Sequence, residues 1–250
     1  MKNAIIEKLL EIEQKENVRI LHAVESGSRA WGFESPDSDY DVRFIYVRDV
    51  DFYLRLGKTK DVIEWQLDEV FDVNGWDLQK ALRLLHSSNP TLFEWNNSPI
   101  VYKTTEEWGN IKEEINKCFS AKSGLYHYLN TAKSNYREYL KGEMVRLKKY
   151  FYVIRPILAC KWILEKNSPP PVLFEELMNT VLEPELKGMV ENLIETKMKT
   201  PEIGEGKKVE KLNEYIEENL ITLKIKIDEF SNEYEKSWNK LDDIFLKIVK

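Results

Sequence analysis

The sequence predicts an α+β fold in which a small mixed β-sheet is followed by a helical C-terminal domain. Within the first 105 residues, short apolar or alternating segments are typical of strands, whereas later apolar residues recur every three or four positions. The chain has 250 residues and is 42% hydrophobic, which suffices for one large or two modest cores and argues against disorder. We therefore expect one domain over residues 1–105 and a helical domain over residues 106–250.

A helix and a strand are expected to lead into a glycine-containing loop. Apolar residues at helical spacing predict an amphipathic first helix whose apolar residues are Ile5, Ile6, Leu9, Leu10 and Ile12. Residues 18–24 are rich in β-branched and aliphatic side chains and predict a strand. Gly27 and Ser28 follow where a second helix should start. Backbone N–H groups there and the Ser28 hydroxyl can bind phosphate oxygens, and Gly27 allows close approach of the backbone.

Two aspartates open the next predicted strand, residues 39–47. Successive side chains point to opposite faces, so Asp39 and Asp41 share one face, while the other face carries Tyr40, Val42, Phe44 and Tyr46. We expect the apolar face to pack in a core and the acidic face to open on a site. Mg²⁺ prefers one or two carboxylates together with phosphate oxygens and waters. A phosphate-binding loop followed closely by two such carboxylates predicts metal-assisted nucleotidyl transfer.

A structural role for these aspartates is the alternative. Residues 35–39 have good turn composition, and aspartates in turns often bond only to nearby backbone amides. This interpretation suits Asp37, which follows Pro36, better than Asp41. An apolar strand follows Asp41, and an unpaired carboxylate there would be costly without a cation or a donor. Arg29 and Arg43 could contact phosphates, but arginines beside acids are more often charge partners.

The same residues resemble a known family. Gly27-Ser28 followed by Asp39-Tyr40-Asp41 resembles the Gly-Ser and Asp-x-Asp signature of the DNA polymerase β-like nucleotidyltransferase superfamily. The wider run over residues 27–44 is similar to a bacterial branch of predicted nucleotidyltransferases of the RNA repair pathway-associated type. Further similarity to that branch is carried by residues 74–82, 88–90 and 94–102. The resemblance covers the N-terminal half and extends less distinctly into the helical remainder.

The resemblance implies a third carboxylate on a neighbouring strand, for which the candidates are Glu64, Asp68, Asp72 and Asp77. Glu64 lies in an alternating segment, residues 62–67, where it can face outward without any function. Asp77 precedes apolar residues at helical spacing, which favours a helix N-cap. If residues 71–73 form a strand, Asp72 projects away from its apolar neighbours, toward the side where Asp39 and Asp41 could be. We therefore predict Asp72, with Asp77 as second choice.

The helical domain offers a candidate contact to the nucleotide. The apolar residues expected in its core are Met144, Leu147, Phe151, Ile154, Leu158 and Trp162, and Lys148, Tyr152 and Arg155 share a different face. Because a helical domain closes the cleft in many enzymes of the superfamily, the resemblance implies that these three residues bind the nucleotide. An ordinary solvated face, with the domain as scaffold, is the alternative. Pro156 should bend or interrupt the helix and could thereby aim Arg155 into the cleft.

Composition excludes several other classes of protein. The three histidines show no metal-ligand spacing and no adjoining nucleophile motif, so hydrolysis by a catalytic triad is not expected. The formal net charge of −6 disfavours broad electrostatic binding to nucleic acid but leaves room for a local basic groove. No signal segment and no apolar run of membrane-spanning length is seen, so we expect a cytoplasmic protein without a membrane partner. The terminal helices suit a scaffold or a dimer surface, and the oligomeric state stays open.

These residues together predict transfer of a nucleoside monophosphate from a nucleoside triphosphate to an acceptor hydroxyl, with release of pyrophosphate. Asp39, Asp41 and Asp72 are expected to bind two Mg²⁺ ions, with Mn²⁺ as an alternative, and Gly27 and Ser28 to hold the terminal phosphates. The preferred nucleotide stays open. The branch resemblance implies an RNA 3′ end as acceptor. Two alternatives are a non-catalytic nucleotide-binding regulatory module and a small-molecule nucleotidyltransferase of the aminoglycoside-modifying kind.

Overall fold

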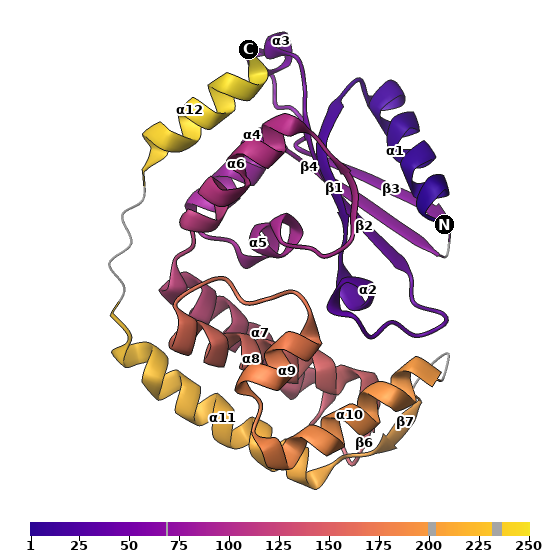
Figure 1. Cartoon of the computed structure of the whole chain (residues 1–250), viewed down its shortest axis with the longest axis vertical. Coiled ribbons are helices and arrows are strands. Elements are labelled where there is room, and N and C mark those ends of the chain that lie inside the picture. Colours follow the sequence, from indigo (N-terminus) through magenta and orange to yellow (C-terminus); the bar gives the residue numbers. More distant parts are fainter. Residues whose placement is uncertain (69, 200–203, 232–236) are drawn as a thin grey trace. The chain divides into compact units, whose positions relative to one another are not determined.

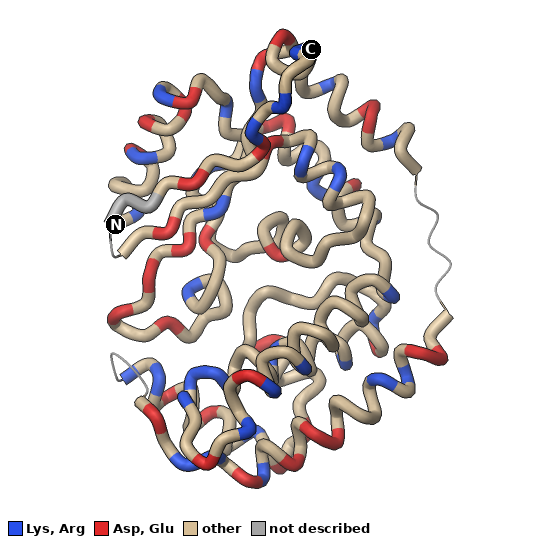
Figure 2. The backbone as a smooth tube through the Cα atoms, turned by 180° about the vertical axis from the view of Figure 1, so that it is seen from behind, with Lys and Arg blue, Asp and Glu red and all other residues tan. Residues whose placement is uncertain are grey.

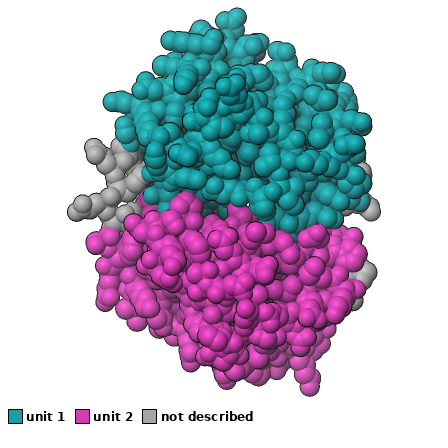
Figure 3. Space-filling model, in the orientation of Figure 1, with its two compact units in different colours: residues 1–30, 39–119, 235–250 teal, residues 31–38, 120–234 magenta. Residues whose placement is uncertain are grey.

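The chain is divided into two compact units. The computed structural model describes residues 1–68, 70–199, 204–231 and 237–250. Unit 1 consists of residues 1–30, 39–119 and 235–250, and unit 2 consists of residues 31–38 and 120–234 (Figure 3). The expected boundary after residue 105 differs from this division. Residues 31–38 belong to unit 2, whereas residues 106–119 and 235–250 belong to unit 1.

A mixed five-stranded sheet forms the centre of unit 1 (Figure 1). The strand order is β3-β4-β2-β1-β5; β2 and β4 are parallel, and the other neighbours are antiparallel. The strands are β1 (Arg19–Glu25), β2 (Tyr40–Val47), β3 (Val62–Asp68), β4 (Phe71–Asp77) and β5 (Val101–Thr104). This confirms the α+β class and the mixed sheet expected from the sequence.

The first helix, α1 (Lys2–Glu16), covers one face of the sheet (Figure 1). Its buried residues Ile5, Leu9 and Ile12 pack against side chains of β1, β2 and β4. From β2 this core receives Val42, Phe44 and Tyr46, as the alternation predicted. Leu10, expected on the apolar face, is instead 49% exposed.

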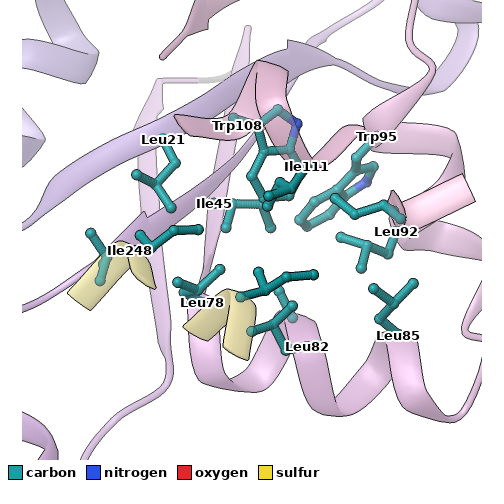
Figure 4. Packing of buried hydrophobic residues seen from close by; sticks show 14 of the residues in the cluster. Leu21, Ile45, Leu78, Leu82, Leu85, Leu92, Trp95, Trp108, Ile111 and Ile248 are labelled. Atoms are coloured by element: carbon teal, nitrogen blue, oxygen red, sulfur yellow. The ribbon is translucent and has the colours of Figure 1, made fainter. Parts of the chain in front are cut away.

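The opposite face of the sheet is covered by α4 (Leu78–His86), α5 (Pro90–Asn96), α6 (Glu106–Lys117) and α12 (Trp238–Val249). Figure 4 shows Leu78, Leu82, Trp108 and Ile111 packing around Ile45 of β2. Ile248 of α12 joins the same core, so the end of the chain completes unit 1. This packing explains why α6 belongs to unit 1.

Side-chain caps fix where three of these helices begin. The Asp77 carboxylate accepts the N–H of Gln79 at the start of α4, which confirms the expected N-cap. Asn89 caps α5, and Thr105 caps α6. Two short helices, α2 (Gly27–Trp31) and α3 (Val50–Tyr53), complete unit 1, except that Trp31 is counted in unit 2.

Unit 2 is mainly helical, and α7 packs along α8. The helices are α7 (Ala121–Tyr139), the 3₁₀-helix η1 (Leu147–Tyr150), α8 (Phe151–Lys166), α9 (Phe174–Val181), α10 (Pro184–Lys199) and α11 (Glu210–Glu229). A two-stranded antiparallel ribbon pairs β6 (Met144–Arg146) with β7 (Glu205–Lys207). Met144 lies on this ribbon and is 56% exposed, so its expected place in the helical core is wrong. Helix α8 continues through Pro156 without interruption.

Residues 31–38 belong to unit 2 because an aromatic side chain anchors them there. The ring of Phe33 lies 4.8 Å from that of Phe151 and 5.3 Å from that of Phe174, between ring centroids. The ammonium group of Lys197 donates to the Phe33 carbonyl at 2.8 Å. Aromatic packing of this kind adds to the burial of apolar area.

Among the described residues, no helix combines the length and the apolarity needed to cross a membrane.

Candidate active site

The two predicted aspartates lie at the N-terminal end of β2. Asp41 is in the strand and partly buried, and Asp39 precedes it and is exposed. The face that carries Asp41 and Arg43 continues into Ile45 and Val47, which are buried beneath the helices of unit 1. We expected this whole face of β2 to open on a site. It is accessible at the N-terminal end of the strand, around Asp41 and Arg43, and is buried further along.

The parallel pairing of β2 with β4 brings the predicted third carboxylate to the same place. Asp41 is the register partner of Asp72, so their side chains project from the same face of the sheet. Val73 is 4% exposed and packs in the core on the other face, as expected for a strand around Asp72. Of the candidates for the third acid, the structure thus brings Asp72 beside Asp41.

Arg43 links these two carboxylates. Its Nη2 lies 3.0 Å from Asp41 Oδ1 and 2.7 Å from Asp72 Oδ2. Its Nη1 donates to the backbone carbonyl of Asp72 at 2.8 Å and to that of Val42 at 3.1 Å. The expectation that this arginine is a charge partner of the acids is confirmed.

Asp77 and Glu64, the other candidates for the third acid whose side chains are described, have other partners. Asp77 is 2% exposed, caps α4 and accepts a hydrogen bond from the Tyr53 hydroxyl. Burial raises the pKa of Asp77 above its usual value. Glu64 lies on β3 and accepts from the Asn74 side chain at 3.4 Å. The side chain of Asp68 lies outside the described residues.

Gly27 lies in direct contact with Asp41. A Cβ atom at Gly27 would be 2.0 Å from Asp41 Oδ2, far inside any allowed contact. Its φ of +61° is in the left-handed region, where glycine carries no steric cost. The N–H of the adjacent Ser26 also donates to the Asp41 carbonyl at 2.9 Å. The sequence placed the loop and the acids near one another in the chain, and the structure joins them in space.

Ser28 is partly exposed in the first turn of α2. This helix has only five residues, so its macrodipole is small and any anion binding must come from its local N–H groups and the hydroxyl. Arg29, in the same helix, places its guanidinium 3.8 Å from the Tyr40 ring centroid. Its Nε donates to the Asp39 carbonyl at 3.1 Å, which ties the loop to the segment that carries both aspartates.

Glu25 is a buried acid beneath the site that the sequence reasoning missed. Its side chain is inaccessible to solvent, and its Oε1 accepts the N–H of Asp41 at 2.8 Å. Its Oε2 accepts a hydrogen bond from the Tyr102 hydroxyl. Burial raises the pKa of Glu25, and these two hydrogen bonds work against that rise. Its place at the end of an apolar strand, directly before the loop, was the signal available in the sequence.

The electrostatics of Asp41 favour a nearby cation. Burial, followed by the negative charges of Asp72 and Asp39, raises its pKa, while the positive charge of Arg43 lowers it. The atoms that the site offers as metal ligands are carboxylate oxygens, the kind of ligand that Mg²⁺ prefers. Among the side chains that the structure describes, which exclude that of Asp68, no group of three His, Cys, Asp or Glu residues could hold a metal. A divalent cation at Asp41 and Asp72 would need further ligands, such as water or phosphate oxygens.

A comparison with protein families decides the assignment. Residues 1–247 match the model of RlaP, the RNA repair pathway DNA polymerase beta family. The chain belongs to this family. The expected relation to the polymerase β-like nucleotidyltransferases is thereby confirmed, and it extends over both units of the chain.

The chain is also similar to two other proteins. The chain is 42% identical, over 255 residues, to the uncharacterized protein YcgL of Bacillus subtilis (strain 168), a match that covers 100% of this chain and 97% of that protein. A nucleotidyltransferase-like protein from Exiguobacterium sibiricum 255-15 matches 90% of this chain and 75% of its own, with 13% identity and a TM-score of 0.33.

The three residues of unit 2 that were predicted to contact the nucleotide differ in their exposure to solvent. Lys148 lies in η1 and is partly exposed. Tyr152 is 41% exposed in α8, and its ring lies 5.7 Å from that of Trp31. Arg155 is only 3% exposed, with its guanidinium 4.7 Å from the Trp31 ring centroid. Arg155 also donates to the carbonyl of Val172 at 3.5 Å, so its burial favours a structural role. Ligand contact by these residues stays a prediction.

Proposed function

We propose that this protein transfers a nucleoside monophosphate from a nucleoside triphosphate to an acceptor hydroxyl. The acceptor oxygen attacks the α-phosphorus, and the bond from that phosphorus to the oxygen bridging the β-phosphate breaks. Pyrophosphate leaves, and the hydroxyl loses its proton. Phosphoryl-type transfers of this kind depend mainly on positioning and on charge stabilisation.

The contact between Gly27 and Asp41 carries this proposal. A backbone that approaches a carboxylate so closely can present a phosphate and its cation to one another without a side chain in between. Arg43 contacts both Asp41 and Asp72, and Asp72 supplies a second carboxylate from the neighbouring strand β4. A binding module without catalysis would not need this second strand's carboxylate, so its presence favours an enzyme.

Each residue of the site is given a role. Asp39, Asp41 and Asp72 would hold two Mg²⁺ ions, or Mn²⁺, which when bound lower the pKa of the acceptor hydroxyl and neutralise charge on the triphosphate. Gly27 and Ser28 bind the terminal phosphates, and Asp72 accepts the proton of the acceptor hydroxyl. Glu25 fixes the backbone amide of Asp41 from below.

The helical unit and the acceptor complete the proposal. Lys148 and Tyr152 contact the nucleotide, and the buried Arg155 supports Tyr152 through their shared neighbour Trp31. We propose an RNA 3′ end as acceptor, since the family is described as part of an RNA repair pathway. Lys and Arg are interspersed with Asp and Glu along both units (Figure 2), so we expect recognition of a short RNA end rather than broad coating of nucleic acid. The cytoplasm is the location we propose for this reaction.

Transfer of label tests this function. The full-length protein is incubated with α-phosphate-labelled nucleotides, Mg²⁺ and total cell material, beside Asp39→Ala and Asp41→Ala variants. Asp37→Ala, which removes an exposed acid of the nearby turn, is the matched control and should label as the wild type does. Label that is lost to nuclease supports an RNA or DNA acceptor, and stability to alkali separates DNA from RNA.

The other outcomes point elsewhere. Label lost to protease, or recovered in small molecules, would contradict an RNA acceptor but not nucleotidyl transfer. If the wild type binds nucleotide and no sample contains label that depends on Asp41, the proposed transfer is wrong and a regulatory nucleotide-binding module is favoured.

A further inference from the structure

Arg43 is committed to the two carboxylates of the candidate active site by nearly all of its hydrogen-bonding capacity. Its Nη2 contacts Asp41 Oδ1 at 3.0 Å and Asp72 Oδ2 at 2.7 Å, and its Nη1 donates to the carbonyls of Asp72 and Val42. A guanidinium has five N–H groups, and these contacts use four of them. The side chain is only 17% exposed, so it is packed in place rather than free to sample solvent.

The guanidinium also supplies the positive charge that this group of acids requires. The negative charges of Asp72 and Asp39 act on Asp41, which is itself largely removed from water. An ionised carboxylate in such a position needs a cation or several hydrogen-bond donors. Arg43 provides both, because a guanidinium carries a positive charge and arranges its donors in a fixed fork.

A divalent cation would require the same carboxylates. Hard cations bind carboxylate oxygens, and a second positive charge in contact with Arg43 would be repelled by it. Arg43 could leave without disturbing the sheet, since β2 and β4 are already held by their own backbone ladder. Release of the arginine would also free its fork of donors, a geometry that suits phosphate oxygens.

We propose that Arg43 is a resident cation that competes with the divalent metal for Asp41 and Asp72. In the metal-free protein it holds the two carboxylates together through its hydrogen bonds. Metal binding then displaces the guanidinium from at least one of them. This inference rests on the metal-dependent function proposed above, and it concerns the order of events at that site rather than the reaction.

Mn²⁺ binding in the absence of nucleotide tests the competition directly. We would titrate the full-length protein with Mn²⁺ and follow the free ion by electron paramagnetic resonance, for the wild type, Arg43→Gln and Arg43→Lys. Competition predicts that Arg43→Gln binds Mn²⁺ about tenfold more tightly than the wild type, and that Arg43→Lys, which keeps the charge but loses the fork, lies between them. Equal or weaker binding by Arg43→Gln would overturn the proposal, since an arginine that only positions the acids should assist the metal.

Two further variants separate this inference from the proposed function. Asp41→Asn should abolish the site, alone or combined with Arg43→Gln. If Asp41→Asn abolishes Mn²⁺ binding and Arg43→Gln does not tighten it, only the role of Arg43 is wrong. If neither the wild type nor Arg43→Gln has a site that depends on Asp41, both the metal-dependent function and this inference fail.

A measurement on the unmodified side chain covers the case in which Arg43→Gln does not fold. Arginine Nε–H signals of the ¹⁵N-labelled wild type are recorded during titration with Mg²⁺, and the Arg43 signal is assigned by its loss in Arg43→Lys. Displacement predicts a saturable shift of this signal at the Mg²⁺ concentration that fills the site. A signal that stays unchanged while Mg²⁺ binds would contradict displacement.

Discussion

Asp41 and Asp72 lie opposite one another across the parallel pair of β2 and β4, and one nitrogen of Arg43 contacts a carboxylate oxygen of each. The two acids are distant in sequence, and the strand register brings them to the same place. Because side chains alternate between faces, a shift by one residue would move Asp72 to the face occupied by Val42 and Val73. The site therefore depends on the same register that buries the core beneath α1.

Replacement of Asp72 by Asn should lower nucleotidyl transfer by about 10²- to 10⁴-fold, the range expected for loss of a positioned proton acceptor. Asn preserves the size and one acceptor oxygen, so the sheet should keep its stability. Glu64→Gln on the neighbouring strand β3 is the matched control and should retain wild-type activity. Rates of pyrophosphate release measure both. Full activity of Asp72→Asn would remove Asp72 from the catalytic residues.

Gly27→Ala should lower the rate of transfer by about 10²-fold or more and lower stability. The added methyl group would collide with Asp41 Oδ2, and the backbone conformation of Gly27 costs about 1–2 kcal/mol for a residue with a side chain. Displacement of a catalytic group by about 1 Å can reduce rate by about 10²-fold. Activity and thermal unfolding should therefore both fall.

Gly109→Ala is the control for Gly27→Ala. Gly109 lies in α6, and a methyl group there would meet no atom within 4 Å. Alanine favours helix over glycine by about 1 kcal/mol, so this variant should unfold at a slightly higher temperature with unchanged activity. If Gly27→Ala behaved in the same way, the close contact between the loop and Asp41 would not matter for function.

Local patterns predicted much of the site, whereas its tertiary contacts required the structure. Alternation along residues 39–47 and the capping pattern at Asp77 gave β2 and the start of α4 correctly, because both depend on near neighbours in the chain. The bond from Asp41 to Glu25 and the packing of Phe33 with Phe151 join distant segments. Nothing in the local spacing of these residues identifies their partners.

Tyr152 should contribute to nucleotide binding through its ring. Tyr152→Ala is expected to weaken the binding of a nucleoside triphosphate by about tenfold, in line with the 1–3 kcal/mol typical of stacking on a base. Tyr152→Phe should bind nearly as well as the wild type, because it retains the aromatic face. Tyr126→Ala on α7 provides the control for loss of an aromatic residue from the same unit. Calorimetric titration of the full-length protein measures the affinities, and equal binding by Tyr152→Ala and the wild type would exclude this contact.

His22 should make the protein less stable as pH falls below about 6.5. The ring is 3% exposed and stacks on Trp108, and burial lowers the pKa of His22 to about 4. Between these pH values the folded state thus binds fewer protons than the unfolded state. The contribution of His22 to the free energy of unfolding is fully present above pH 6.5 and is lost as pH falls to about 4. The shift corresponds to about 3 kcal/mol.

His22→Gln isolates this contribution in urea unfolding at several pH values from 7.5 to 4.5. Glutamine can still donate to the Trp95 carbonyl, the bond that His22 Nε2 makes, but it does not titrate. The difference in unfolding free energy between the two proteins should therefore shift in favour of His22→Gln as pH falls. His127→Gln, at an exposed position of α7, should follow the wild type throughout. If the curves for wild type and His22→Gln run parallel over this range, His22 binds its proton equally well in both states, and its burial does not disfavour the charged ring.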